Sequence, residues 1–264
     1  EAVATFTTSQ GLKERAYVQL GHGGYDADGP NNKANDLPSN SGNITIGAGG
    51  NVVFQGGAAH RNYAQLGHGG LDTKGASSGN ITIDAVDATH EVGGIRFIAG
   101  HGGYRQFDYQ NYVQLGHGGH EADGNHFGNI YVRGTKDVDG MGLLLKAGDR
   151  QDANAMVGHG GYSARTGTVT PGRTYYGLNG DIDIKVTGDV AVVAGTLTTN
   201  NPNYRDDGRL SAQIGHGGYD ADATNDNTYY FGATGNAAIP VSTAGAGDGN
   251  WGHFGDITVV STSG

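Results

Sequence analysis

Short runs of alternating apolar and polar residues recur along the whole chain, separated by Gly, Asn and Asp. The clearest run reads Gly42-Asn-Ile-Thr-Ile46, in which two isoleucines alternate with polar residues. Strand side chains point to opposite faces with a period of two, so this pattern predicts a β-strand with one buried face. Amphipathic stripes at helical spacing are missing, and the frequent glycines would destabilise a helix. The pattern therefore predicts an all-β chain.

A longer repeat surrounds the tetrapeptide Gly-His-Gly-Gly, which occurs six times. Five occurrences follow a run such as Tyr17-Val-Gln-Leu-Gly-His22, and they define repeats 1 to 5 by their histidines: His22, His68, His117, His159 and His216. The sixth, His101, follows Ile95-Arg-Phe-Ile98 and is expected in another column. The five regular histidines are 46, 49, 42 and 57 residues apart, so a fixed unit carries loops of variable length.

A second β-type run follows the histidine in every repeat, and a third run follows in most of them. The second runs begin with Gly-Asn or Gly-Asp and cover 42–46, 79–83, 128–132, 180–184 and 255–259. Third runs follow in the first four repeats, at 52–55, 95–98, 143–146 and 190–193. Three short strands per repeat, joined by turn residues without a helical crossover, predict a parallel β-solenoid of about five coils. Residues 1–264 are predicted to form this single solenoid segment.

The alternation within each run predicts which side chains face the core. In repeat 1, Val18, Leu20 and His22 share the inward face, and Ile44 and Ile46 do so in the second run. The glutamines between the inward residues are predicted to face out, namely Gln19, Gln65, Gln114 and Gln213. Coils about 4.8 Å apart would stack like residues into ladders, with isoleucine over isoleucine in the core.

The predicted stack is short and its ends carry no evident cap. Five coils rise only about 24 Å, and bare coil ends are edge strands that attract pairing. We therefore expect either a slice of a longer solenoid or a subunit that associates head to tail into a fibre.

Composition excludes several classes of protein. The 51 glycines lack the three-residue period of collagen, and the net charge of −10 leaves no basic stripe for nucleic acid. Apolar runs fall short of the roughly 20 residues of a membrane-spanning helix. The chain has no Cys, which excludes disulfides and thiolate metal sites and is compatible with an oxidising compartment.

The inward histidine column has two interpretations. Neutral imidazole is a common metal ligand, but each of these rings is flanked by glycines and has no inward carboxylate beside it. We expect a structural ladder of neutral rings hydrogen-bonded to turn backbone, formed by His22, His68, His117, His159 and His216, and we assign no metal to it.

The turns that follow the Gly-His-Gly-Gly corners are rich in acidic residues. They give a second hypothesis for a metal site. One column reads Asp28, Lys74, Asp123, Arg165 and Asp222, and its alternating charges are expected to pair without an ion. The neighbouring column, Asp26, Asp72 and Glu121, lacks such compensation. Carboxylates of this kind are calcium ligands, so these three residues are the secondary candidates for calcium, although we expect a chain without a cofactor.

Aromatic residues concentrate in long segments between the first and second runs of repeats 4 and 5. They are the candidate binding residues: Tyr175, Tyr176, Tyr229, Tyr230, Phe231 and Trp251. Loops on a rigid scaffold often carry recognition, and flat rings suit sugars or a partner chain. An enzyme is not expected, because catalytic sites on β-helices break the repeat and the outward positions of this chain repeat instead.

The repeat as a whole resembles known bacterial proteins. The pattern Ala/Val-Gln-Leu/Ile-Gly-His-Gly-Gly, followed by Gly-Asn-Ile-Thr-Ile and an apolar strand, resembles the repeats of filamentous-haemagglutinin-like exoproteins and autotransporter passengers. The resemblance implies a right-handed parallel β-helix that is secreted or bound at the bacterial cell surface and serves adhesion, biofilm matrix or a surface fibre. The alternative from a different class is a module that binds glycans through the loop aromatics or metal through the His and Asp columns.

Overall fold

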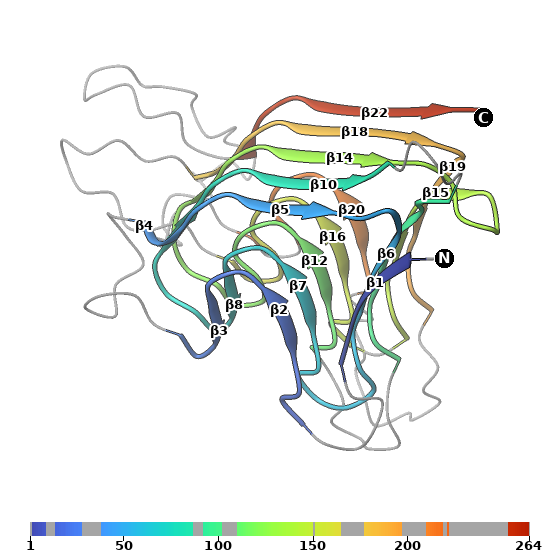
Figure 1. Cartoon of the computed structure of the whole chain (residues 1–264). Coiled ribbons are helices and arrows are strands. Elements are labelled where there is room, and N and C mark those ends of the chain that lie inside the picture. Colours follow the sequence, from blue (N-terminus) through green and yellow to red (C-terminus); the bar gives the residue numbers. More distant parts are fainter. Residues whose placement is uncertain are drawn as a thin grey trace, which may run out of the picture.

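The chain is all-β in a computed structural model that describes residues 2–8, 14–27, 38–86, 92–101, 110–149, 151–164, 177–196, 210–218, 221 and 253–263. No helix occurs among these residues, and every strand pair within them is parallel (Figure 1). The predicted all-β, parallel architecture is therefore confirmed, and it is the arrangement expected of a β-solenoid.

Equivalent runs of successive repeats pair into three five-stranded sheets. The first-strand sheet contains β2 (Val18–Leu20), β7 (Ala64–Leu66), β12 (Val113–Leu115), β16 (Ala155–Val157) and β20 (Ala212–Ile214). The second-strand sheet contains β5 (Ile44–Gly47), β10 (Ile81–Ala85), β14 (Ile130–Gly134), β18 (Ile182–Thr187) and β22 (Ile257–Thr262). The third-strand sheet contains β1 (Ala2–Thr7), β6 (Gly50–Gln55), β11 (Ile95–Ile98), β15 (Met141–Lys146) and β19 (Asp189–Val193).

A fourth sheet, which the sequence pattern did not predict, lies just before the second strands. It contains β4 (Pro38–Ser41), β9 (Ala76–Ser78), β13 (His126–Phe127), β17 (Leu178–Asn179) and β21 (His253–Phe254). A two-stranded sheet of β3 (Gly23–Tyr25) and β8 (Gly69–Leu71) follows the histidine corner. Three strands per repeat was thus an incomplete prediction, because pieces of two to four residues are too short to show an alternating pattern.

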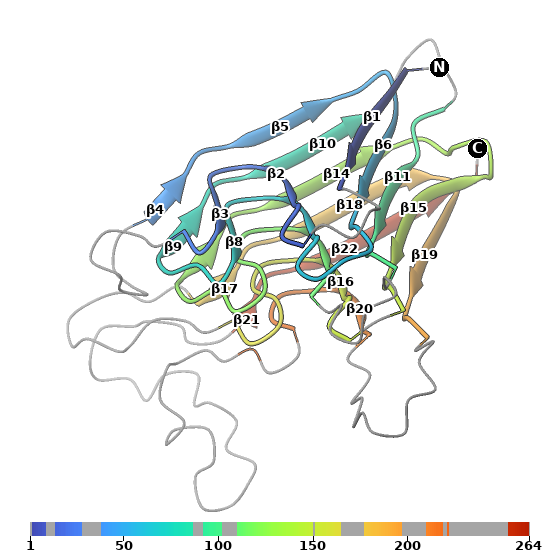
Figure 2. The same cartoon turned by 90° about the horizontal axis from the view of Figure 1, so that it is seen from below.

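The strands pair in the register that the repeat predicts. Ile81 is the Cα partner of Ile44 on one side and of Ile130 on the other, and the same column continues to Ile182 and Ile257. Figures 1 and 2 show the second strands lying side by side from β5 to β22, so that neighbouring strands come from successive repeats. Equivalent residues are therefore stacked on one another.

The core lies between the three main sheets and consists of the inward columns. Its second-strand members include Ile81, Ile83, Ile130, Val132, Ile182 and Ile184, all at most 1% exposed. The third strands add Phe6, Phe54 and Phe97, whose rings stack with centroids 4.5 and 5.1 Å apart. Each buried side chain of this size contributes about 1.5–3 kcal/mol of hydrophobic stabilisation.

Glycine before each corner histidine permits the close approach of successive repeats. A Cβ atom on Gly67 would lie 1.9 Å from the Gly116 carbonyl oxygen, and one on Gly116 would lie 1.8 Å from that of Gly158. Both glycines also have φ near +150°, which other residues rarely adopt. Any side chain at these positions would force neighbouring repeats apart.

Candidate functional site

The five corner histidines form a continuous stack along the first-strand sheet. The rings of His22, His68, His117, His159 and His216 lie with adjacent centroids 4.9 Å apart and interplanar angles between 2° and 10°. The parallel register of the strands places them there, since each histidine follows its strand by the same two residues.

Both nitrogens of the inner rings are engaged by backbone. The backbone N–H of His68 donates to Nδ1 of His117 at 3.0 Å, and the same bond recurs between each pair of neighbouring repeats. The Nε2 atom of His117 lies 2.8 Å from the Gly79 carbonyl oxygen of the preceding repeat, a contact that also recurs. Because Nδ1 must accept, Nε2 carries the proton, and each ring is the neutral tautomer.

Burial keeps the inner rings neutral. It lowers the pKa of His117 to about 3 and that of His159 well below its ordinary value, and the pKa of His68 is lowered by the same cause. Neighbouring rings of the stack oppose protonation as well. A neutral ring with both nitrogens hydrogen-bonded to backbone offers no lone pair to a metal, so the geometry of this stack is that of a structural ladder.

The glutamines between the inward residues lie on the face of the strand opposite the core, as predicted, but in repeats 2 and 3 another segment covers that face. Gln65 and Gln114 are buried. The Gln114 amide nitrogen donates to the carbonyl oxygens of His117, Gly158 and Gly160 at 2.8–3.2 Å, and Gln65 makes the equivalent three contacts. The Gly-Gly segment after each histidine folds back over this outer face, which a period-two argument applied to the strand alone does not foresee.

A tyrosine ladder runs beside the glutamines in repeats 1 to 3. The rings of Tyr17, Tyr63 and Tyr112 stack with centroids 4.9 and 4.7 Å apart, and Tyr112 donates its hydroxyl hydrogen to the Gln65 side-chain oxygen. Burial raises the pKa of both Tyr63 and Tyr112, so these hydroxyls stay protonated. The repeated Tyr-x-Gln spacing in the sequence was a signal for both ladders. It carried no information on whether the tyrosine and glutamine side chains are buried.

The acidic corner residues occupy a backbone position that constrains their conformation. Asp26, Asp72 and Glu121 have φ of +52°, +55° and +56°, and Ser163 has +51° at the same place in repeat 4. Asp tolerates this left-handed region better than most residues, which gives the column a turn-forming role. Within the part of the chain that the structure describes, no three His, Asp or Glu residues are grouped so as to hold a metal ion.

Only part of the neighbouring charged column is described. Lys74 and Asp123 are backbone bridge partners, so these opposite charges do stand in one column in neighbouring repeats. Asp28, Arg165 and Asp222 lie outside the described residues, and so do the candidate binding aromatics Tyr175, Tyr176, Tyr229, Tyr230, Phe231 and Trp251.

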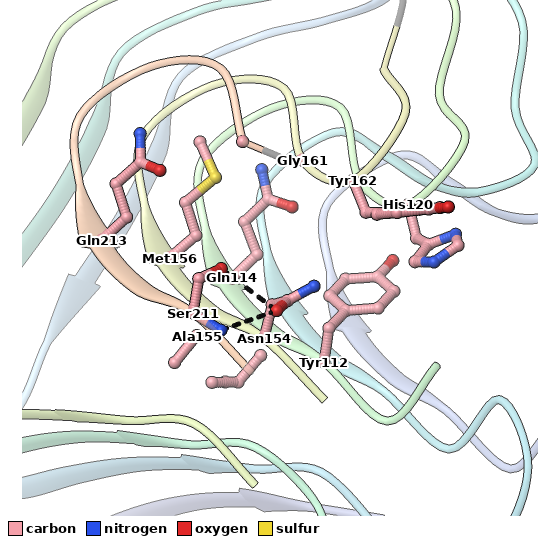
Figure 3. Close-up of a pocket in the computed structure, with 12 residues that line it drawn as sticks. Tyr112, Gln114, His120, Asn154, Ala155, Met156, Gly161, Tyr162, Ser211 and Gln213 are labelled. Atoms are coloured by element: carbon pink, nitrogen blue, oxygen red, sulfur yellow. Dashed lines mark hydrogen bonds between the residues drawn. The ribbon is translucent and has the colours of Figure 1, made fainter. Parts of the chain in front are cut away.

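A small hollow opens where both ladders change composition (Figure 3). Asn154 replaces the tyrosine in repeat 4 and Met156 replaces the glutamine, so the space beyond Tyr112 is not filled by a fourth ring. Gln114, Met156 and Gln213 line one side in a row, while His120 and Tyr162 lie on the other (Figure 3). Asn154 accepts two hydrogen bonds from Ser211, which closes part of the gap.

Comparisons with known proteins leave the function open. No family model, curated protein or solved structure matches this chain. In the described ranges, no helix has the length and apolar character needed to cross a membrane.

Proposed function

We propose that this chain is an extracellular structural and adhesive β-solenoid that forms, or belongs to, a bacterial surface fibre. One observation carries the proposal: among the described residues, the second-strand sheet ends at β22 on exposed apolar residues. At the inward positions of β22, Ile257 is 50% exposed and Val259 is 42% exposed, while their counterparts in β18 are buried. An exposed apolar edge of a sheet is a site for further pairing.

In this proposal the chain is a right-handed parallel β-helix of five coils. Five strands in each main sheet support the number of coils. The general preference of parallel strand connections for a right-handed path supports the handedness. Repeat proteins of this kind need neighbouring repeats to complete each core layer, and growth at the ends then produces a fibre.

Ladders along the stack suit a load-bearing role. Backbone hydrogen bonds, stacked histidines and buried glutamine amides all cross the boundary between repeats 2 and 3. Separating two repeats would break all of these together, so a load along the stack is shared among many bonds. The proposal assigns no catalytic step to the chain and requires no cofactor.

Electron microscopy of the purified chain tests the fibre. We expect filaments whose abundance grows with protein concentration, and surface labelling of the producing bacterium with an antibody against the chain. Particles that stay single at high concentration in sedimentation, together with labelling confined to the cell interior, would contradict the proposal.

The hollow beside Tyr112 is the observation that favours a second candidate, a ligand-binding module. Its lining includes polar and aromatic side chains, which are the kinds of group that contact a glycan. A glycan array should then show saturable binding that Tyr229→Ala and Trp251→Ala abolish. Binding of Zn²⁺ in a titration, lost on changing His68 and His117 to Ala, would instead assign the histidine column to metal.

A further inference from the structure

The two ends of the stack carry the same residue types at the same positions. Strands β5 and β22 are the two edges of the second-strand sheet (Figure 2). Strand β5 carries Ile44 and Ile46, which are buried, and the exposed Thr45, while β22 carries the exposed Ile257, Thr258 and Val259. In the first-strand sheet, β2 reads Val-Gln-Leu and β20 reads Ala-Gln-Ile. Each end therefore resembles the neighbour that the other end lacks.

The glutamine ladder stops with bonds unmade at the β20 end. The side-chain nitrogen of Gln19 donates to its own histidine carbonyl and to Gly67 and Gly69 of the next repeat. Gln213 makes only the first of these three contacts, to the His216 carbonyl. Continuing the series, its two missing acceptors would be the carbonyl oxygens of Gly21 and Gly23 in another copy.

The histidine stack is incomplete at the opposite end. In repeats 2 to 5, the Nε2 atom pairs with the carbonyl oxygen of the glycine that opens the preceding second run: Gly42, Gly79, Gly128 and Gly180. The next glycine in this series is Gly255, in the last repeat. Within the described residues, His22 Nε2 has no partner, and Gly255 of another copy would supply one.

An asparagine ladder ends in the same complementary way. The backbone N–H of Asn80 donates to the Asn43 side-chain oxygen, and the series continues until Asp256 donates its N–H to Asp181. The next acceptor in the series is the Asp256 carboxylate, and the next donor is the backbone N–H of Asn43 in another copy. An N–H to carboxylate bond is a strong form of hydrogen bond.

The glycines at the two ends of the stack leave room for the backbone of another repeat. A Cβ atom on Gly79, Gly128 or Gly180 would lie within 2.0 Å of a carbonyl oxygen in the preceding repeat, whereas Gly42 has nothing within 4 Å. Gly158 similarly lies against Gly215, but Gly215 has no backbone atom of a further repeat beside it. The backbone at both ends is thus open to the close approach seen inside the stack.

We infer that the β19, β20 and β22 end of one copy binds the β1, β2 and β5 end of a second copy, in the register of the interior. This inference rests on the proposed fibre function and specifies its junction: β22 pairs with β5, β20 with β2, and β19 with β1. A second copy is the occupant because it presents the matching apolar rungs and the missing partners of three separate hydrogen-bond ladders. Ile44 and Ile46 would cover Ile257 and Val259.

Cysteine pairs test the register directly, because the chain has no cysteine of its own. Thr45 and Thr258 are exposed members of one column, so Thr45→Cys with Thr258→Cys should join copies through disulfides. Facing Cα atoms of adjacent parallel strands are about 4.8 Å apart, within disulfide range. After mild oxidation, non-reducing electrophoresis should show a ladder of multimers that a reductant removes.

The matched control is Thr45→Cys with Val260→Cys, which moves one thiol two residues along the same strand. We expect at least tenfold less multimer from this offset pair. Equal yields from both pairs, or a higher yield from the offset pair, would overturn the inferred register. Filaments in the microscope without disulfide ladders from Thr45→Cys and Thr258→Cys would overturn the junction and leave the fibre standing. If neither filaments nor disulfide-linked multimers formed, both the proposed fibre and the inferred junction would be overturned.

A single substitution tests the junction in case the double-cysteine variants misfold. Gln213→Ala removes only the amide that is expected to cross the junction, and Gln213 is partly exposed in the single chain. We expect thermal unfolding of the dilute protein to stay unchanged while association in sedimentation weakens at least tenfold. Unchanged association would count against the inferred junction.

Discussion

The interior of the stack and its last rung hold the same kind of residue in different surroundings. Ile130 in β14 is fully buried, whereas Ile257, in the same column of β22, is half exposed. The two isoleucines follow nearly the same local sequence, but β14 lies between two strands of its sheet whereas β22 is an edge strand. In this molecule a repeat is buried by its neighbours rather than by its own sequence, as expected of a one-dimensional repeat protein.

Replacing a glycine in the interior of the stack and one at its last rung should give the largest difference in stability. Gly116 and Gly215 have nearly the same φ, +149° and +147°, but only Gly116 lies against the next repeat. Gly116→Ala adds backbone strain and a collision with the Gly158 carbonyl, and should cost on the order of 5 kcal/mol of unfolding free energy. Gly215→Ala adds the strain alone, about 1–2 kcal/mol. Chemical denaturation of dilute protein measures both, and equal losses would show that packing between repeats is not what these glycines serve.

Acid should affect the buried histidines strongly. Burial lowers the pKa of His117 to about 3, of His126 to about 4, and of His159 well below its ordinary value. In the unfolded chain these side chains take up protons below about pH 6.5, while the folded chain does not. Stability is therefore complete above that pH and is lost as the pH falls toward 3. Between pH 7.5 and 5.5 each histidine should cost about 1.4 kcal/mol, or roughly 4 kcal/mol for the three.

Thermal unfolding over this pH range checks the prediction before most carboxylates titrate. His126→Leu is the matched variant, because the register partner of His126 in the next repeat is Leu178. It should remove about a third of the pH dependence. Stability that is independent of pH between 7.5 and 5.5 would exclude a buried, neutral stack.

Truncating Ile130 and Ile257 compares the stability contributed by the same residue type in the interior and at the last rung. Ile130→Ala should cost about 3 kcal/mol, because it leaves a cavity between β10 and β18. Ile257→Ala should cost less than about 1 kcal/mol in the dilute chain, since half of its surface is already in water. Urea titrations measure the difference. If Ile257→Ala proved as costly as Ile130→Ala, the last rung would be covered in solution.

The smallest expected effects concern the glutamine ladder. Gln114→Met removes three hydrogen bonds to buried carbonyl groups and should cost about 2 kcal/mol. Met156→Gln restores the ladder residue in repeat 4 and should add about 1 kcal/mol. The midpoints of chemical denaturation measure both changes in stability. A loss of stability in Met156→Gln would mean that the hollow beside it is too narrow for the amide.

Periodicity alone was enough to predict the parallel strands, the inward isoleucines and the alignment of the five histidines. These features depend on local alternation and on repetition, both of which are visible in runs such as Gly42-Asn-Ile-Thr-Ile46. Once one strand pairs in parallel with its copy in the next repeat, like residues must fall into columns. The sequence by itself therefore determined the order of the rungs and the composition of the core.

Tertiary structure decided the features that depend on contacts between different parts of a repeat. Gln65 is buried because the Gly-Gly segment folds over the outer face of its strand, and the short strands β9 and β13 pair because the chain places them side by side in neighbouring repeats. The partners of the two His117 ring nitrogens, both of which lie in the preceding repeat, likewise follow from the spacing of stacked backbones. Alternation specifies which side of a strand a residue occupies, but only packing specifies what covers that side.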